Sequence, residues 1–224
     1  MIRRAAALVL VGVFVGVVAS SASAQRVRGD GLAAIVGATT PRADAIVLLH
    51  SDIDFRARLR LIREQPGNPH LGPLPRGLLR ATLDELLGEA LIAVEAERVQ
   101  IASPSERDLR QARERLEALA GGPASFASLV NALGTTEEEL TQMVRRRALV
   151  AVFLEANLEG AASVTDTRVR SAFESGEHPF LGQEFEDVRE AMRIWLARQA
   201  LDEAVARWVQ VLRARVPVRL LAAY

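Results

Sequence analysis

The sequence predicts a mainly α-helical protein in which a long C-terminal helix packs back on the helices that precede it. Apolar residues recur every three or four positions over most of the chain, as they do along one face of a helix. Strand-like apolar runs are short, at 45–49 and at 216–221. With 50% hydrophobic and 25% charged residues, the composition is that of a folded protein. We expect a multi-helix module whose two apolar runs pair in a small two-stranded sheet that joins the chain ends.

Residues 1–24 have the features of a secretory signal peptide. Arg3 and Arg4 precede an apolar run of about fifteen residues, and Ala22 and Ala24 provide the small-residue pattern of a cleavage site. The run is shorter than the ~20 residues that a helix needs to span a bilayer. We therefore expect cleavage after Ala24, export to a periplasm and no stable membrane insertion afterwards. The alternative is an uncleaved membrane anchor.

The composition also disfavours several kinds of function. The 28 basic residues are all arginine, are spread along the chain and are balanced by 28 acidic residues, so nucleic acid is not an expected partner. Cys is absent from the sequence, which excludes disulfides and thiolate metal sites. The predicted fold therefore depends on packing of apolar side chains.

The first part of the chain after the signal contains a leader, a strand and a helix. Residues 25–42 are rich in Gly, Ala and Thr without a helical period, which predicts a flexible leader and places the folded domain at 43–224. After the strand at 45–49, Ser51 is the expected N-cap of a helix, with Asp54 near its third position. Prolines and glycines between Gln65 and Pro75 then predict a loop.

Six further helices are predicted after this loop. A leucine-rich helix runs from about 76 to 100. The next begins at Ser103-Pro104, where Ser103 is the expected N-cap, and it ends at Gly121. The other four are a short helix around 126–133, a helix capped by Thr136 with Glu139, a short helix from 164, and the terminal helix from Phe185. The terminal helix carries one apolar stripe, formed by Val188, Met192, Trp195, Leu196, Leu201, Val205, Trp208, Val209 and Leu212.

Several segments recur in the order found in one family of chaperones. They are Leu74-Pro75, the run LDELLGEALI at 83–92, Ser103-Pro104 with Glu106, Leu133-Gly134 before TEEEL at 136–140, and Val164-Thr165-Asp166. In this order they resemble the SurA-like periplasmic chaperones, whose N-terminal module is also similar to the C-terminal domain of trigger factor. The resemblance covers roughly 43–221. It implies a helical chaperone domain that the terminal helix closes.

The chain departs from that family at one place. SurA-like proteins commonly carry a parvulin prolyl isomerase domain of about ninety residues before the terminal helix, where this chain has only 175–184. Parvulin chemistry is associated with histidines and a Cys or Asp, whereas His50, His70 and His178 are widely separated here. The histidines also lack the close spacing of metal ligands. We therefore expect a chaperone domain with no isomerase activity, no other enzyme activity, no metal and no cofactor.

Four apolar residues near loops or short helices are candidates for contact with a bound peptide. They are Leu71, Leu74, Phe126 and Phe180, each of which has fewer neighbours along the chain to cover it than a residue within a long helix. Ordinary packing in the core is the alternative for each of them.

The resemblance implies an ATP-independent holdase that binds unfolded or extended polypeptides, including outer-membrane proteins, in the periplasm. The chain has no phosphate-binding loop or other nucleotide motif. The alternative is a non-catalytic envelope scaffold or adaptor that binds one specific partner or forms a homodimer.

Overall fold

The computed structural model describes residues 30–37, 45–65, 68, 70–100, 103–158, 160 and 163–224. The expected signal peptide at 1–24 lies outside these residues. The described part is mainly helical, as predicted, with seven helices that account for 69% of the described residues. The elements are β1 (Leu32–Val36), β2 (Ile46–Leu49), α1 (His50–Glu64), α2 (Arg76–Arg98), α3 (Glu106–Leu119), α4 (Pro123–Leu133), α5 (Glu137–Asn157), α6 (Asp166–Ser175), α7 (Phe185–Arg215) and β3 (Val218–Leu220).

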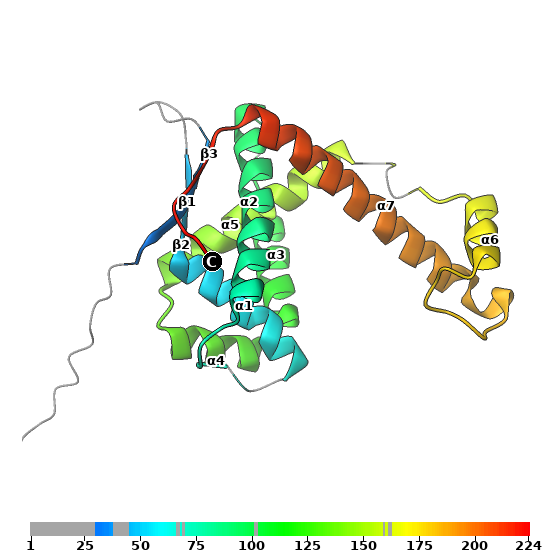
Figure 1. The fold of residues 1–224 in the computed structure, drawn as a ribbon, viewed down its shortest axis with the longest axis horizontal. Coiled ribbons are helices and arrows are strands. Elements are labelled where there is room, and N and C mark those ends of the chain that lie inside the picture. The colour runs from blue at the N-terminus through cyan, green and yellow to red at the C-terminus, as the bar shows by residue number, and fades with distance from the viewer. Residues whose placement is uncertain are drawn as a thin grey trace, which may run out of the picture.

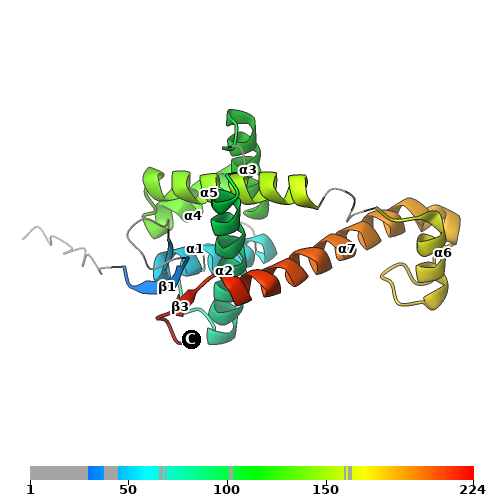
Figure 2. The same cartoon turned by 90° about the horizontal axis from the view of Figure 1, so that it is seen from above.

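The molecule consists of a body and an arm. The sheet and helices α1–α5 form the body. Helix α7 runs obliquely away from the body, and α6 packs against the N-terminal half of α7 to form the arm (Figures 1 and 2). With 31 residues, α7 is about 46 Å long at 1.5 Å per residue. Its C-terminal half packs on α2, where Val209 lies over Gly88. The predicted packing of the terminal helix on the N-terminal helices is therefore confirmed.

The sheet differs from the prediction, because the runs at 45–49 and 216–221 do not pair with each other. The sheet has three strands in the order β2-β1-β3, and both neighbours of β1 are antiparallel to it. Ala34 is opposite Leu48 on one side and opposite Leu220 on the other. The chain ends are thus joined through β1, which lies within the segment 25–42 that was predicted to be a flexible leader. Leu32–Val36 is short and contains two alanines, which have a low preference for strands. It forms a strand because β2 and β3 pair with its two edges and because Ala34 and Val36 are buried.

The apolar side chains form three separate clusters. One lies between the sheet, α2, α5 and the C-terminal half of α7, and includes Leu91, Phe153 and Leu212. A second joins α1, α3, α4 and α5. The third holds α6 to the N-terminal half of α7 in the arm. The arm therefore has a small apolar core of its own where it extends beyond the body (Figure 2).

Two of the three predicted helix caps are wrong and one is confirmed. Thr136 caps α5 by accepting a hydrogen bond from the Glu139 N–H, and the Glu139 carboxylate accepts one from the Thr136 N–H at 2.7 Å. For α3 the N-cap is Ser105 in place of Ser103, because Asp108 bonds back to the Ser105 N–H at 2.8 Å. For α1 the helix begins at His50, ahead of Ser51, because Asp52 accepts from the Leu49 N–H at 2.9 Å. In both helices an aspartate three residues after the cap, Asp52 or Asp108, accepts a hydrogen bond from the N–H of the cap residue and so determines where the helix begins.

Candidate functional site

Phe126, one of the four predicted peptide-contact residues, is buried, so this prediction is wrong. Its side chain is 1% exposed in the cluster between α1, α3, α4 and α5. The ring meets that of Phe55 edge to face at 6.1 Å between centroids, and the Arg113 guanidinium lies 5.1 Å from its centre. The short helix α4 folds onto α1 and α3, and this covers an apolar residue that the sequence places next to a turn.

The other three predicted residues lie at two distant places. Leu71 is 59% exposed and Leu74 is half-buried, both on the loop that precedes α2 at the base of the body (Figure 1). Phe180 is half-buried in the link between α6 and α7, where it packs on the cluster of the arm. The structure therefore does not bring the four residues together into one surface.

A cleft of about 1180 Å³ opens between α3, α5 and α7. Between Arg147 and Glu155, α5 presents the apolar residues Val150, Ala151 and Leu154 to the cleft, Leu158 follows at the end of this helix, and α7 contributes Leu201. Among the described residues of α7, Leu201 alone lines the cleft, so most of the lining comes from α3 and α5. Roughly 300–1,000 Å³ is usual for the pocket of a small-molecule ligand, and this cleft is larger.

The α3 side of the cleft is polar and basic. Arg107, Gln111 and Arg115 line it at spacings of four residues, which places them on one face of the helix. Neither arginine forms a hydrogen bond or an ion pair with a described residue. These residues were not singled out from the sequence, although their spacing on one helical face was a signal that could have found them.

Glu89 of α2 forms the charged end of the cleft, together with Arg147. Its carboxylate is surrounded by three guanidinium groups, at 2.9 Å from Arg56, 3.1 Å from Arg146 and 3.6 Å from Arg147. Burial by itself raises the pKa of Glu89, but the charges of the three arginines more than offset this and hold the pKa below its ordinary value. Burial, with the nearby charge of Arg56, lowers the pKa of Arg147. Arg56 also pairs with Glu85, and Arg146 lies 3.9 Å from Asp52, so the network ties α1, α2 and α5 together with carboxylates and guanidinium groups in similar number.

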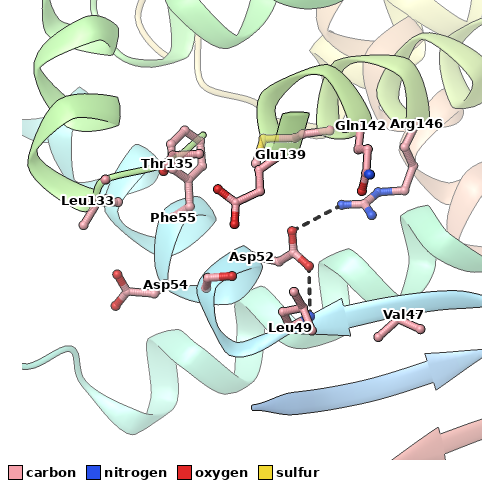
Figure 3. Close-up of a pocket in the computed structure, with 13 residues that line it drawn as sticks. Val47, Leu49, Asp52, Asp54, Phe55, Leu133, Thr135, Glu139, Gln142 and Arg146 are labelled. Atoms are coloured by element: carbon pink, nitrogen blue, oxygen red, sulfur yellow. Dashed lines mark hydrogen bonds and ion pairs between the residues drawn. The ribbon is translucent and has the colours of Figure 1, made fainter. Parts of the chain in front are cut away.

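A second, smaller pocket of about 180 Å³ lies between β2, the start of α1 and the start of α5 (Figure 3). Asp52 is its central polar group. One carboxylate oxygen of Asp52 accepts from the Leu49 N–H, and the other lies 3.9 Å from Arg146. Burial raises the pKa of Asp52, although the hydrogen bond from Leu49 and the charge of Arg146 act in the opposite direction. Since this carboxylate stabilises the start of α1, we assign the pocket a structural role.

The link between α6 and α7 is closed by His178. Its ring stacks on Phe173 at 4.9 Å between centroids, its Nε2–H donates to the Phe173 carbonyl at 3.1 Å, and its Nδ1 accepts from the Phe180 N–H at 3.1 Å. Both ring nitrogens are thus used by the backbone of the link. At this end of the molecule Leu181 and Ile194 remain 70% and 63% exposed.

The described residues include no group of three or more His, Cys, Asp or Glu side chains that could hold a metal ion. No helix in the described ranges is both long and apolar enough to cross a membrane. A scan against models of protein families and a search of curated proteins both give no match for this chain.

Proposed function

We propose that the chain is an ATP-independent holdase, which binds unfolded or extended polypeptide in the cleft between α3, α5 and α7. The observation that carries the proposal is the combination of an open cleft of about 1180 Å³ with an apolar wall on α5. Apolar contact stabilises a bound segment by roughly 25 cal/mol per Å² and needs no particular sequence. Such binding is reversible and requires no nucleotide.

The resemblance of the sequence to SurA-like periplasmic chaperones supports the same proposal. The pattern at 1–24 is that of a signal peptide, so we propose that the protein acts in the periplasm on envelope and outer-membrane proteins in transit. Because the link at 175–184 has no room for a parvulin domain, we propose that the protein holds its clients without isomerising their prolyl bonds.

The arm adds a second feature that suits a chaperone. The third apolar cluster fixes α6 on the N-terminal half of α7, and the same helix contributes Leu201 to the cleft. The exposed Leu181 and Ile194 near its end provide additional apolar surface. A scaffold that docks one partner on this end of the arm is the competing function that these two residues favour.

The proposal predicts that residues 25–224 suppress aggregation of an unfolded outer-membrane protein. A urea-denatured outer-membrane protein is diluted into buffer, and light scattering is followed with and without the protein at one to four equivalents. We expect the scattering to fall as the protein is added. The double variant Ala156→Gln with Leu201→Gln makes two cleft-lining positions polar without adding charge, and it is expected to lose most of the suppression.

Ala127→Gln with Val211→Gln is the matched control, because both residues are exposed and neither lines the cleft. The control should suppress aggregation as well as the unchanged protein. Circular dichroism checks that all variants remain folded. If the unchanged protein does not reduce scattering at four equivalents, the holdase proposal fails. If the cleft variant retains full suppression, the binding surface lies elsewhere, with the end of the arm as the next candidate.

A further inference from the structure

The α3 and α5 sides of the cleft differ in chemical character. The α3 side carries two arginines, whereas the α5 side carries mainly apolar residues. Arg107 and Arg115 are eight residues apart on α3, which corresponds to ~12 Å along the helix axis. Gln111 lies between them on the same face. The cleft therefore has one edge that favours negative charge and one edge that favours apolar side chains.

The carboxylates that line the cleft are mostly engaged with other groups, although Asp108 also attracts the charge of Arg107 beside it. Asp108 is engaged at the start of α3, where it accepts hydrogen bonds from the Ser105 N–H at 2.8 Å and from the Ser105 hydroxyl at 2.7 Å. Glu89 is held by three arginines. Glu155, near the end of α5, is the other carboxylate of the lining, and it forms no ion pair with a described residue. Glu155 is thus the one carboxylate of the lining that forms neither a hydrogen bond nor an ion pair with a described residue, whereas two arginines of α3, Arg107 and Arg115, are in that state.

We infer that the cleft selects extended segments in which acidic residues four positions apart alternate with apolar residues. An extended chain rises ~3.3 Å per residue, so residues i and i+4 are ~13 Å apart and point to the same side. This spacing matches that of Arg107 and Arg115. The apolar residues at i+1 and i+3 then point to the opposite side, toward Val150 and Leu154 of α5.

This inference rests on the proposed function, since it assumes that the cleft binds polypeptide. The α5 wall favours a peptide over a nucleic acid, because a polyanion offers no apolar side chains to this wall. The arginines attract acidic residues at long range as well as by direct contact. Because salt screens this attraction, the preference for acidic peptides is expected to depend on salt concentration. Salt concentration therefore separates the two contributions to the affinity, because it weakens the attraction of acidic residues and leaves the apolar contacts in place.

The test compares three fluorescein-labelled ten-residue peptides with the same apolar residues, measured by fluorescence anisotropy with residues 25–224. They carry Glu, Gln or Lys at two positions four residues apart. We expect the Glu peptide to bind about threefold to tenfold more tightly than the Gln peptide, as two partly exposed ion pairs provide, and the Lys peptide to bind more weakly than both. The difference is expected to shrink in 0.5 M NaCl.

Arg107→Gln with Arg115→Gln is expected to bind the Glu and Gln peptides with equal affinity. Arg110→Gln is the matched control, because Arg110 is an exposed arginine on the same helix that does not line the cleft. The control should retain the full preference for Glu. Equal binding of the Glu and Gln peptides by the unchanged protein overturns the inference and leaves the holdase proposal standing. A preference that persists in the double variant, or that Arg110→Gln also removes, overturns it as well. If no peptide binds, the proposed function itself is contradicted.

Discussion

Replacing Glu89 with glutamine is expected to lower the free energy of unfolding by about 3–5 kcal/mol, because it leaves three buried or half-buried arginines without their carboxylate. The side chain of Glu89 is only 11% exposed, so water cannot replace the lost charge. The three arginines come from α1 and α5, and the substitution therefore loosens the contact of both helices with α2. Urea denaturation followed by circular dichroism measures the effect.

Glu85→Gln is the control for this prediction. Glu85 is one helical turn away on α2 and also pairs with Arg56, at 3.1 Å, but its side chain is 45% exposed. We expect a loss below about 1 kcal/mol, as for other solvent-exposed ion pairs. Equal losses for the two variants would show that burial of the Glu89 network has no energetic consequence.

The same carboxylate predicts a specific dependence of stability on pH. The pKa of Glu89 in the folded protein lies below its ordinary value of 4.5, so the folded state binds this proton less readily than the unfolded chain does. Its stabilising contribution is therefore complete above pH 4.5 and is lost as the pH falls through the lower pKa of the folded state. The difference in stability between the unchanged protein and Glu89→Gln should be constant from neutral pH to about pH 5 and then decrease toward acid. A difference that grows on acidification would contradict the assignment of charges.

Phe153→Ala is expected to destabilise the protein by about 3–5 kcal/mol, the usual cost of removing a fully buried aromatic ring. Phe153 is 1% exposed on α5, and its ring lies 5.0 Å from that of Trp208 on α7. The substitution thus opens a cavity where α7 is attached to the body. Chemical denaturation measures the loss, and a red shift of tryptophan fluorescence before global unfolding would report early release of α7.

Phe180→Ala provides the comparison for Phe153→Ala. Phe180 is half-buried in the separate cluster of the arm and does not contact the core of the body. We expect a loss below about 2 kcal/mol that loosens the link between α6 and α7 and leaves the attachment of α7 unchanged. If Phe180→Ala were as damaging as Phe153→Ala, the arm and the body would have to unfold as one unit in spite of their separate clusters.

The helices were predictable from the sequence because their signals are local. The apolar period from Val188 to Leu212 gave the long terminal helix, and Thr136 with Glu139 gave the start of α5. A period or a capping pair involves residues within one or two turns, so no knowledge of the rest of the fold is needed. The prediction failed locally only where an aspartate three residues after Leu49 or Ser105 set the cap in place of the expected serine.

The candidate cleft was not predictable in the same way. Its apolar wall on α5 resembles the stripe of any buried helix, and only the oblique path of α7 leaves Val150 and Leu154 beside an open space. Phe126 illustrates the converse, since its position next to a turn suggested exposure, whereas the packing of α4 on α1 and α3 buries it. Exposure is a property of neighbours that are distant in the sequence.

The sequence by itself therefore determined the helical class, the extent of the terminal helix and the short link at 175–184, since each depends on residues that are close along the chain. Only the tertiary structure decided how the ends of the chain meet. Leu32–Val36 lies between Ile46–Leu49 and Val218–Leu220, and no local pattern distinguishes it from a flexible Gly- and Ala-rich segment. A strand of five residues forms because two others pair with it and a core covers it, and those partners are supplied by the fold.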